Sequence, residues 1–554
     1  EIMTIILKRS IITYHQNESK EHYMSGLQPL HITFFIYIIA MIGIGFYAYK
    51  STKDLSDYIL GGRSLGSVVT ALSAGASDMS GWLLMGLPGA VFIAGISESW
   101  IAIGLTLGAY LNWLFVAGRL RMFTEKANNA LTLPDYFHSR FDDKSKILKI
   151  ISAVIILFFF VIYCASGVVA SARLFESTFN MQYDVAIWVG AIATIAYVFI
   201  GGFLAVSWTD TVQATLMIFA LLLVPVVVIL KMNNFGEFDI MNTIEVVRNE
   251  SEKHLNFTHG LTWIAIVSLL AWGLGYCGQP HILVRFMAAD SVKTIPAARR
   301  ISITWMALCL IGAVSVGFFG YAYFLEHPEE GINVLGGVNA AGEVVKGNAE
   351  SIFMELAKVL LNPWIAGIVL SGVLAAVMST LSCQLLVSSS ALTEDLYKGF
   401  LRPKATDGEL VWIGRMMVFL VAAISIYIAY NPDSKVLSLV SYAWAGFGAA
   451  FGPVVIFSIF WKRTSRNGVL FGMIVGALTV IIFPKVKEWL AASGNVEVAD
   501  ILAQFPILNL YEIVPGFVLA SITIVIVSLF SRPSQKIMDR FDETAVAYKE
   551  AMRS

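Results

Sequence analysis

The sequence predicts an all-α integral membrane protein with about thirteen transmembrane helices. The chain is 57% hydrophobic and only 14% charged, and its mean hydropathy of +0.73 is far too high for a soluble protein of 554 residues. Apolar runs of about 20 residues, the length that crosses a bilayer, recur from end to end. No long hydrophilic segment interrupts them, so the chain is expected to form one membrane domain.

The apolar runs follow one another with short polar connections. The expected spans lie near residues 30–48, 68–94, 97–117, 147–173, 184–203, 211–230, 259–280, 300–324, 351–388, 411–429, 437–461, 468–484 and 509–531. Residues 1–29 are mixed in composition and lack a signal-peptide cleavage pattern. We expect them to be an N-terminal extension without a functional role.

The basic residues are distributed unequally between the two sides of the predicted membrane. The odd-numbered connections, with the C-terminal tail included, hold roughly 24 Lys and Arg, Arg285 among them, whereas the even-numbered connections hold about 7. Because basic residues favour the cytoplasmic side, the N-terminus is expected outside and the C-terminus inside. The acidic, Gly-rich loop 325–350 then falls outside, as a solvated connector or a cover over an outer vestibule.

Several classes of chemistry find no support in the sequence. The four cysteines fall inside apolar spans without metal-ligand spacing, so they are expected to pack as small hydrophobic residues. No paired-histidine metal motif and no phosphate-binding loop of the GxxxxGK[ST] type is present. The chain therefore contains no motif for hydrolysing ATP.

A carboxylate interrupts the second span. Asp78 lies at its middle, among Ser73, Ser77, Ser80 and the glycines 75 and 81. A charge at membrane depth costs several kcal/mol unless it is compensated. One interpretation is an ordinary kink with a satisfied polar residue. The other is an unwound helix whose backbone carbonyls coordinate a cation at the membrane midplane.

A second interrupted span lies five spans further on. Residues 272–280 contain three glycines and Pro280, and they break the seventh span. Gly- or Pro-interrupted helices at corresponding positions in two halves indicate an inverted-repeat transporter. The chain then divides into a leading helix (30–48), a first repeat (68–230), a second repeat (259–461), trailing helices (468–531) and a cytoplasmic tail (532–554).

The ninth span contains a cluster of hydroxyl groups. Ser379 and Thr380 are adjacent, and Ser382 lies on the same helical face as Ser379. Such hydroxyls often bond to the backbone or join helices in membranes. A hard cation such as sodium also prefers several oxygen ligands. Two hydroxyls from this span, with carbonyls from the break at Asp78, would form such a site.

Aromatic residues in the broken seventh span are candidates for contact with an organic solute. Trp272 and Tyr276 are four residues apart and share a helical face. Tyr163, in the fourth span, is more typical of ordinary packing.

Charged residues near span ends have simpler interpretations. Arg63 precedes the second span and is either a cytoplasmic anchor or part of an inner gate. Asp210 is expected to cap the start of the sixth span, where the helix dipole favours an acid. Glu355 and Lys358, three residues apart, are expected to neutralise each other.

Taken together, these motifs make the chain similar to the sodium:solute symporter family, almost continuously from residue 33 to 531. The resemblance is closer to the proline carriers than to the family members for sugars, iodide or pantothenate. The motifs that carry it are Ser73–Ala90, Gly201–Asp210, Gly273–Tyr276 with Gly278–His281, Ala375–Ser382 and Ser441–Gly448.

The resemblance implies a LeuT-type fold of five-plus-five inverted repeats and a set of site residues. It implies a sodium site formed by the carbonyls of Ala76, Met79 and Ala376 and the hydroxyls of Ser379 and Thr380, with Asp78 influencing sodium affinity. Tyr163, Trp272, Tyr276 and Pro280 would form the proline pocket, Ser80, Gly81 and Trp82 would contribute to substrate binding or coupling, and Arg63 would act in inward release.

The function implied is sodium-coupled uptake of L-proline across a bacterial cytoplasmic (inner) membrane by alternating access. Sodium would be the coupling ion, with no other cofactor, no nucleic acid and no obligatory protein partner. A symporter of the same family for another small organic solute remains the alternative. An ion channel would need repeated filter elements, and an intramembrane enzyme would need a nucleophile and base or metal ligands. Neither is visible in the sequence.

Overall fold

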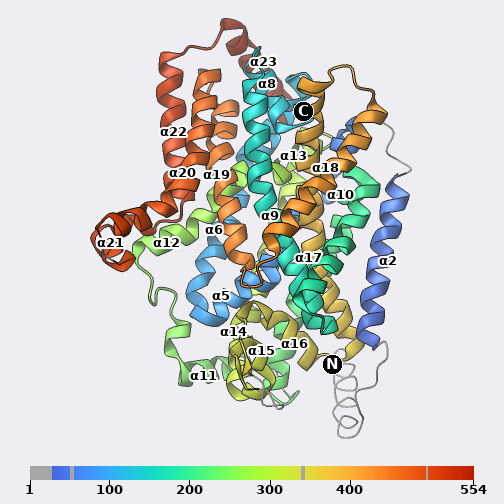
Figure 1. Cartoon of the computed structure of the whole chain (residues 1–554), viewed down its shortest axis with the longest axis vertical. Helices are drawn as coiled ribbons and strands as arrows, with labels where there is room; N and C mark the ends of the chain where they lie inside the picture. The colour runs from blue at the N-terminus through green and yellow to red at the C-terminus, as the bar shows by residue number, and fades with distance from the viewer. Residues whose placement is uncertain (1–27, 50–54, 237, 339–343, 495–496, 554) are drawn as a thin grey trace.

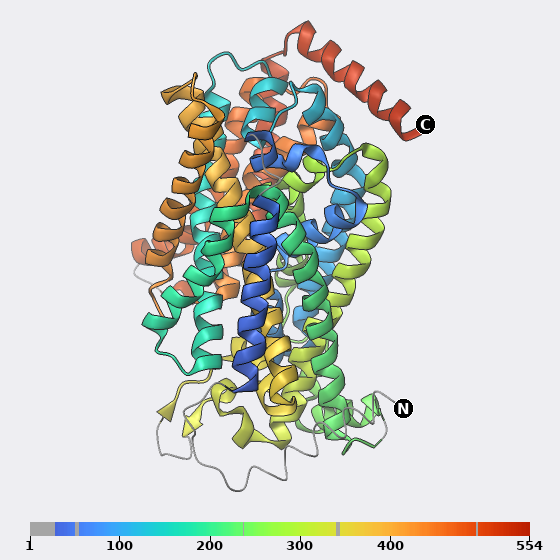
Figure 2. The same ribbon diagram turned by 90° about the vertical axis from the view of Figure 1, so that its right-hand side faces the viewer.

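The computed structural model describes residues 28–49, 55–236, 238–338, 344–494 and 497–553. Long helices run roughly side by side along the long axis of the molecule (Figures 1 and 2). Only one small sheet occurs in these ranges, the antiparallel pair β1 (Gly337–Val338) and β2 (Val344–Val345). The predicted N-terminal extension lies almost entirely outside the described residues. The predicted all-helical membrane architecture is confirmed.

The first half of the described chain is helical from α2 onward. Its elements are α2 (Pro29–Tyr49), α3 (Leu55–Leu60), η1 (Gly61–Arg63), α4 (Ser67–Asp78), η2 (Trp82–Gly86), α5 (Leu87–Ala94), η3 (Gly95–Glu98), α6 (Ser99–Leu111), η4 (Asn112–Ala117), α7 (Gly118–Lys126), α8 (Leu133–Arg140), α9 (Ile147–Phe179), α10 (Tyr183–Met232), α11 (Ile240–Glu250) and η5 (Glu252–Leu255).

The second half continues in the same manner. Its helices are α12 (Trp263–Leu270), η6 (Ala271–Gly278), α13 (Pro280–Ala288), η7 (Val292–Thr294), α14 (Ile295–Glu326), η8 (Pro328–Gly331), α15 (Ile332–Leu335), η9 (Ala349–Ser351), α16 (Ile352–Leu360), α17 (Pro363–Ser390), η10 (Ala391–Leu401), α18 (Asp407–Ala429), α19 (Val436–Phe460), α20 (Arg466–Gly494), α21 (Val498–Gln504), η11 (Pro506–Asn509), α22 (Ile513–Phe530) and α23 (Gln535–Arg553).

Two spans are broken where the sequence predicted. In the second, α4 ends at Asp78, and the chain resumes as the π-helical turn η2 after a short non-helical stretch at Met79 and Ser80. In the seventh, the 3-10 segment η6 separates α12 from α13, and Gln279 is extended. Because neither stretch has regular α-helical hydrogen bonding, both leave backbone groups free to contact other partners.

The fifth and sixth spans are joined more directly than the sequence suggested. They form the single helical element α10, which is interrupted only at Gly202 (φ 63°, ψ −163°). A side chain there would be strained, and its Cβ would lie 2.8 Å from the Tyr58 ring. Asp210 is consequently two turns inside the helix and fully buried, so the prediction that it caps a helix start is wrong.

The expected ninth span, 351–388, is two helices rather than one. α16 ends at Leu360, and Asn362 caps α17 by accepting the N–H of Trp364 at 3.0 Å, with Pro363 as the first helical residue. Proline disfavours a helical conformation in the residue before it, which explains the break. The Glu355–Lys358 ion pair within α16 is present as predicted.

The loop 325–350 is structured in its described part. The carboxylate of Glu350, in η9, accepts the N–H groups of Val436 and Leu437 at 3.1 and 3.2 Å, at the start of α19. Lys346 pairs with Asp433 at 2.7 Å in the connection before α19. Burial raises the pKa of Glu350, and the two N–H donors oppose that rise. The loop is therefore attached to α19 and is more than a solvated connector.

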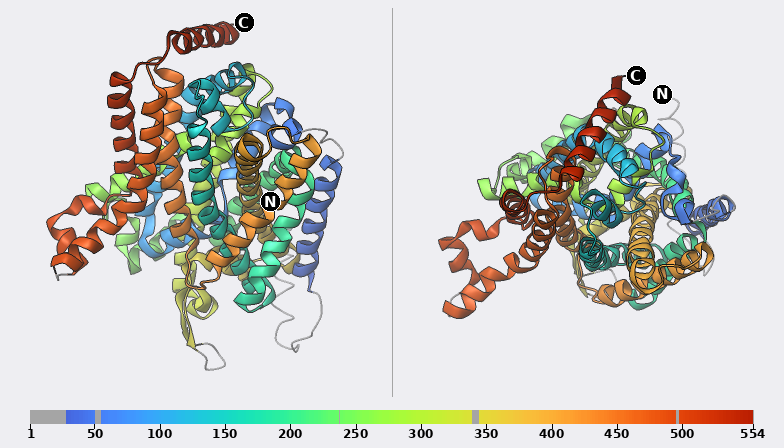
Figure 3. Two further views of the ribbon diagram at one scale, coloured as in Figure 1. Left: turned by 45° about the horizontal axis from the view of Figure 1, so that its top comes forward. Right: turned by 90° about the horizontal axis from the view of Figure 1, so that it is seen from above.

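Ten helices in the described residues are long and apolar enough to cross a membrane, and two shorter apolar helices accompany them. The count of thirteen stays a prediction. The start of α2 and the helix α23 lie at opposite ends of the long axis (Figures 1 and 2). Helix α23 runs across one end, while α20, α21 and α22 project from one side (Figure 3).

Candidate functional site

The two hydroxyls of the ninth span reach the broken second span. Ser379 Oγ donates to the carbonyl of Ala76 at 2.8 Å, and Thr380 Oγ1 donates to the same oxygen at 3.2 Å. Ser379 Oγ is also 3.1 Å from the carbonyl oxygen of Ala376 in its own helix. All four residues are buried. The structure therefore gathers two carbonyls and two hydroxyls where α4 meets α17.

Met79 stands at the edge of this group. It is the C-terminal cap of α4, and its ψ of 76° turns its carbonyl out of the helical direction. Its side chain is fully buried. A cluster of oxygens with no net charge of its own, in a buried setting, suits a monovalent hard cation.

Asp78 lies one residue before this cap. Its Oδ2 accepts the hydroxyl of Tyr276, which lies in η6. Its backbone carbonyl accepts the indole N–H of Trp82 at 3.0 Å. Its Oδ1 has no hydrogen-bond partner among the described residues. The carboxylate thus joins the two broken spans and keeps one oxygen available.

Aromatic rings surround the two breaks. The Trp272 ring lies 6.4 Å from the Trp82 ring and 5.5 Å from the Tyr511 ring, between centroids. Tyr276 meets Trp444 edge to face at 5.1 Å, and the Trp444 indole N–H donates to the carbonyl of Trp272 at 2.7 Å. Trp272 and Tyr276 are therefore brought together with aromatic residues from η2, from α19 and from the segment before α22.

Trp444 and Tyr511 were not identified as site residues from the sequence. Both are buried, and both contact Trp272. The only sequence signal for Trp444 is its position in the Ser441–Gly448 stretch, whose small residues allow close helix packing. Tyr511, at the start of the last span, carries no such signal.

The remaining residues near the break are packed tightly. Ser80 is buried, and its Oγ is 3.4 Å from the N–H of Trp82. Gly81 lies against α9, where a Cβ would approach Ala170 Cβ to 2.6 Å. Tyr163, also on α9, is fully buried, and its hydroxyl has no hydrogen-bond partner among the described residues. Two unpartnered polar atoms, Asp78 Oδ1 and Tyr163 Oη, thus belong to residues of this region.

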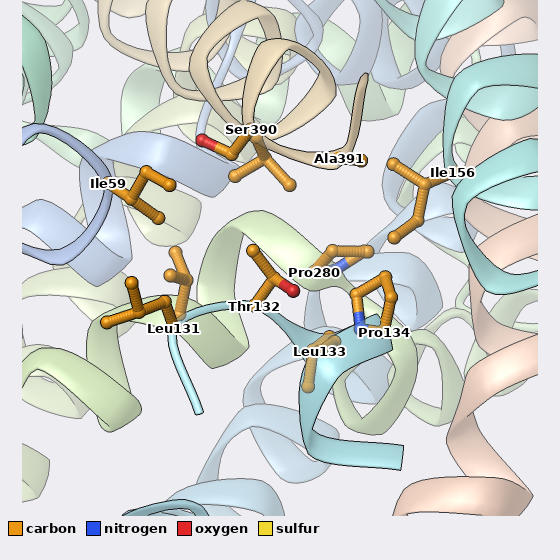
Figure 4. Close-up of a pocket in the computed structure, with 11 residues that line it drawn as sticks. Ile59, Leu131, Thr132, Leu133, Pro134, Ile156, Pro280, Ser390 and Ala391 are labelled. Carbon is orange, nitrogen blue, oxygen red and sulfur yellow. The ribbon is translucent and has the colours of Figure 1, made fainter. Parts of the chain in front are cut away.

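Pro280 lies apart from the aromatic group. It begins α13 and faces a small pocket lined also by Leu131, Pro134, Ile156 and Ala391 (Figure 4). The pocket's volume of 20 Å³ is enough for about one water molecule. The structure thus places Pro280 beyond the C-terminal end of η6, next to the connection before α8.

Arg63 ties together the segments at the predicted cytoplasmic side. Its guanidinium donates to Asn129 Oδ1 at 2.7 Å, to the carbonyl of Ala130 at 2.8 Å, to Thr124 and to the carbonyl of Met287. Burial, with a smaller contribution from Arg121, lowers the pKa of Arg63 to about 10, so it stays charged at neutral pH. Arg63 thus joins α7, the connection before α8 and the end of α13.

A buried ion pair lies between the site and the Arg63 contacts. Arg285 Nη2 is 3.4 Å from Asp210 Oδ2, and both side chains are fully buried. Ser73 donates to the same carboxylate oxygen at 2.7 Å, and the Cys383 thiol lies 2.5 Å from Arg285 Nη2. Arg285 is therefore not an exposed cytoplasmic residue, and Cys383 is not simply packed in apolar surroundings. Sequence patterns gave no sign of this network.

The profile of the sodium:solute symporter family matches residues 58–476. A sodium/proline symporter of Escherichia coli (strain K12) is 62% identical over 524 residues, which is 94% of this chain and 97% of the relative. A sodium/proline symporter of Haemophilus influenzae is 57% identical over 534 residues, which is 95% of this chain and 100% of the relative.

Among solved structures, the chain is similar to a Na⁺-coupled sialic acid symporter in a substrate-bound outward-open state. The TM-score is 0.73 at 18% identity, and the match covers 92% of this chain and 99% of that chain. At this identity the likeness concerns the fold alone. It confirms the predicted LeuT-type class of fold.

Proposed function

The chain belongs to the sodium:solute symporter family, and we propose that it takes up L-proline together with sodium. Its high identity to bacterial sodium/proline symporters over nearly the whole length of both chains is the observation that carries this function. It is a secondary transporter and not an enzyme.

Sodium would bind where α4 meets α17. The carbonyls of Ala76, Met79 and Ala376 and the hydroxyls of Ser379 and Thr380 supply five oxygens, and four of these five residues are already in mutual contact. Hydroxyls that now donate to the Ala76 carbonyl would turn their lone pairs toward the ion. Asp78, close by on α4, would raise sodium affinity through its charge.

Proline would bind among the aromatic rings beside the breaks. Its apolar ring would lie against Trp272 and Tyr276, with Trp82, Ser80, Gly81 and Tyr163 completing the site. Its carboxylate would meet the N-terminal N–H groups of the half-helix that resumes after Ser80, since such termini favour anions. Pro280 would contribute on the inner side.

Sodium binding would couple to proline binding through the break. An ion that holds α4 against α17 fixes Asp78, and Asp78 is bonded to Tyr276 in the substrate region. Release of both ligands inward would require the Arg63 contacts to open.

The sodium gradient supplies enough free energy for concentrative uptake. One sodium ion contributes about 2.3 kcal/mol per 100 mV of membrane potential. A tenfold inward gradient adds about 1.4 kcal/mol. The sum of about 3.7 kcal/mol would sustain roughly 500-fold accumulation at one-to-one coupling.

The membrane, the orientation and the domain boundaries of the carrier are proposed from its sequence. We place it in a bacterial cytoplasmic membrane with the N-terminus outside and the C-terminus inside, as the distribution of basic residues indicates. Residues 68–230 and 259–461 would be the two inverted repeats, flanked by the leading helix 30–48, the trailing helices 468–531 and the tail 532–554.

Uptake by the purified carrier in proteoliposomes tests this function. Sodium, proton and voltage gradients are imposed separately, and labelled proline is measured inside. We expect a sodium gradient alone to drive accumulation and a voltage to increase it. Accumulation driven by protons without sodium would refute the coupling. Strong competition by another small solute, with weak uptake of proline itself, would favour the alternative substrate.

A further inference from the structure

An apolar groove opens on the surface of the membrane domain. It has a volume of 510 Å³ and lies between α6 with η4 on one side and α19 with α22 on the other, over the segment η6. Only apolar residues, glycines and one cysteine line it, including Leu107, Phe115, Leu274, Cys277, Phe460 and Phe517. Leu107 and Phe115 are each about half exposed. Because the groove lies between predicted membrane spans, we expect it to face lipid.

The floor of the groove is backbone. A Cβ on Gly108 would lie 2.2 Å from the carbonyl oxygen of Gly273, and a Cβ on Gly104 would lie 2.5 Å from that of Leu270. Helix α6 and η6 therefore touch through their main chains. No side chain rises from these positions to fill the groove, so it is a fixed feature of the packing.

A cation stands at the end of the groove where α7 begins. The Arg119 guanidinium lies over the Phe460 ring at 4.6 Å and over the Tyr548 ring at 5.3 Å. Phe460 itself lines the groove. Arg119 is partly exposed and makes no hydrogen bond or ion pair with any other residue that the structure describes. Ring contacts of this kind use the face of the guanidinium and leave its N–H edge free for an anion.

We propose that this groove binds an anionic phospholipid. One acyl chain lies along the groove from Phe460 toward Phe517, and the phosphate accepts hydrogen bonds from Arg119. Charge complementarity and shape favour a lipid. The residues that line the groove are apolar, and Arg119 lies at the end that is predicted to face the anionic cytoplasmic leaflet.

The lipid would contact two functional elements. Leu274 and Cys277 line the groove, and they belong to η6, which also carries Trp272 and Tyr276. Tyr548 lies in α23, so Arg119 also connects the headgroup position to the C-terminal helix. An anionic lipid in this groove would therefore support the broken seventh span from its outer side.

Photo-crosslinking in vesicles tests the proposal. The full-length carrier is reconstituted in phosphatidylethanolamine vesicles that contain a little phosphatidylglycerol with a diazirine in its acyl chain. After irradiation, adducts are mapped by mass spectrometry. We expect adducts concentrated on residues 107–115 and 274–277. Excess unlabelled phosphatidylglycerol should remove them, and phosphatidylcholine should not.

Two pairs of variants separate the site from general lipid contact. Arg119→Gln should reduce these adducts about fivefold, the effect of one basic residue at an anionic membrane surface, whereas Arg300→Gln, at an exposed arginine, should leave them unchanged. Leu107→Trp fills the groove with Arg119 intact and should also reduce them. Leu420→Trp, at a half-exposed leucine of α18, is its control.

Any of the following results would overturn the proposal. The first is adducts spread evenly over other lipid-facing helices such as α2 and α18. The second is equal competition by phosphatidylcholine, or adduct levels that neither Arg119→Gln nor Leu107→Trp changes. The third is crosslinking between two copies of the carrier through this face, which would make it a protein interface. If Arg119→Gln fails to fold, the Leu107→Trp pair decides.

Discussion

Tyr276 donates its hydroxyl to the carboxylate of Asp78, so a hydrogen bond joins the second and seventh spans at the points where both are broken. Asp78 comes from the second span and Tyr276 from the seventh, which occupy corresponding places in the two predicted repeats. One residue was singled out from the sequence for a cation and the other for the organic solute. If the proposed sites are right, their contact would couple sodium binding to proline binding.

Loss of this hydroxyl should weaken the response to sodium. Tyr276→Phe leaves the buried Asp78 carboxylate without its donor, a loss of about 1–3 kcal/mol for a buried group. We expect the sodium concentration for half-maximal proline uptake to rise about tenfold. The control is Tyr323→Phe, which removes a tyrosine hydroxyl that donates to Glu330, far from the breaks. Equal sodium dependence in wild type and Tyr276→Phe would contradict the coupling route.

Removing the hydroxyls of α17 should have a similar but larger effect. The double variant Ser379→Ala, Thr380→Ala deletes two of the five proposed oxygens, and Asp78→Cys deletes the nearby charge. Each should raise the sodium requirement by about tenfold or more while protein abundance in the membrane changes little. Ser371→Ala is matched to them, because Ser371 is buried in the same helix and bonds only to Gly367. An unaltered sodium requirement in both variants would remove the assignment.

Sodium itself should be needed for binding. If the ion orders the break before proline enters, the purified carrier in sodium-free choline buffer should bind proline far more weakly than in sodium. The measurement is equilibrium binding of labelled proline in detergent, with the Ser371→Ala protein as a second folded reference. Equal binding in both buffers would show that the ion site does not prepare the proline site.

The buried pair of Asp210 and Arg285 should matter for stability. Asp210→Asn leaves the Arg285 guanidinium uncompensated, and breaking a buried pair from one side costs about 3–5 kcal/mol. The melting temperature in detergent should fall, and Asp210→Leu with Arg285→Met should recover part of the loss. Lys462→Gln, which breaks the exposed pair with Asp542, should change it little. An Asp210→Asn protein with the melting temperature of the wild type would argue against a stabilising role for the ion pair.

The Arg63 contacts should hold the inner side closed. Arg63→Gln removes charged hydrogen bonds to three segments, each worth about 1.5–3 kcal/mol. The variant Leu131→Cys places a thiol in the pocket beside Pro280. When it is combined with Arg63→Gln, this thiol should react about tenfold faster with an impermeant maleimide in inside-out vesicles. The same reporter with Arg299→Gln, whose guanidinium lies over the Tyr110 ring, should keep its original rate. If Arg63→Gln left the reactivity of the reporter thiol unchanged, Arg63 would be an anchor and not part of a gate.

The sequence was most informative where a local pattern determines the structure. A carboxylate among serines and glycines predicted the break after Asp78, and clustered glycines before Pro280 predicted the break at η6. The association of Ser379 and Thr380 with Ala76 followed from the family resemblance, and the structure brings these residues together. Their role with sodium stays a prediction.

The sequence was least informative where partners come from distant segments. Trp444 and Tyr511 join Trp272 only through packing of α19 and the start of α22. The sequence places Asp210 at the start of an apolar run, but the backbone leaves helical geometry earlier, at Gly202, so Asp210 lies inside a helix instead of capping one. The split of the ninth span, in contrast, had a local signal in Asn362-Pro363 that outweighs the apolar run around it.

The carboxylate of Glu350 links the loop 325–350 to the helix that carries Trp444. It holds the first two N–H groups of α19, and the same helix presents Trp444 to Trp272 and Tyr276 about two turns further on. Because Glu350 is bonded to the start of α19, we expect a movement of α19 near the rings to change the position of this loop. Binders raised against the loop's surface would then report which way the carrier faces, and the tightest among them would lock it there.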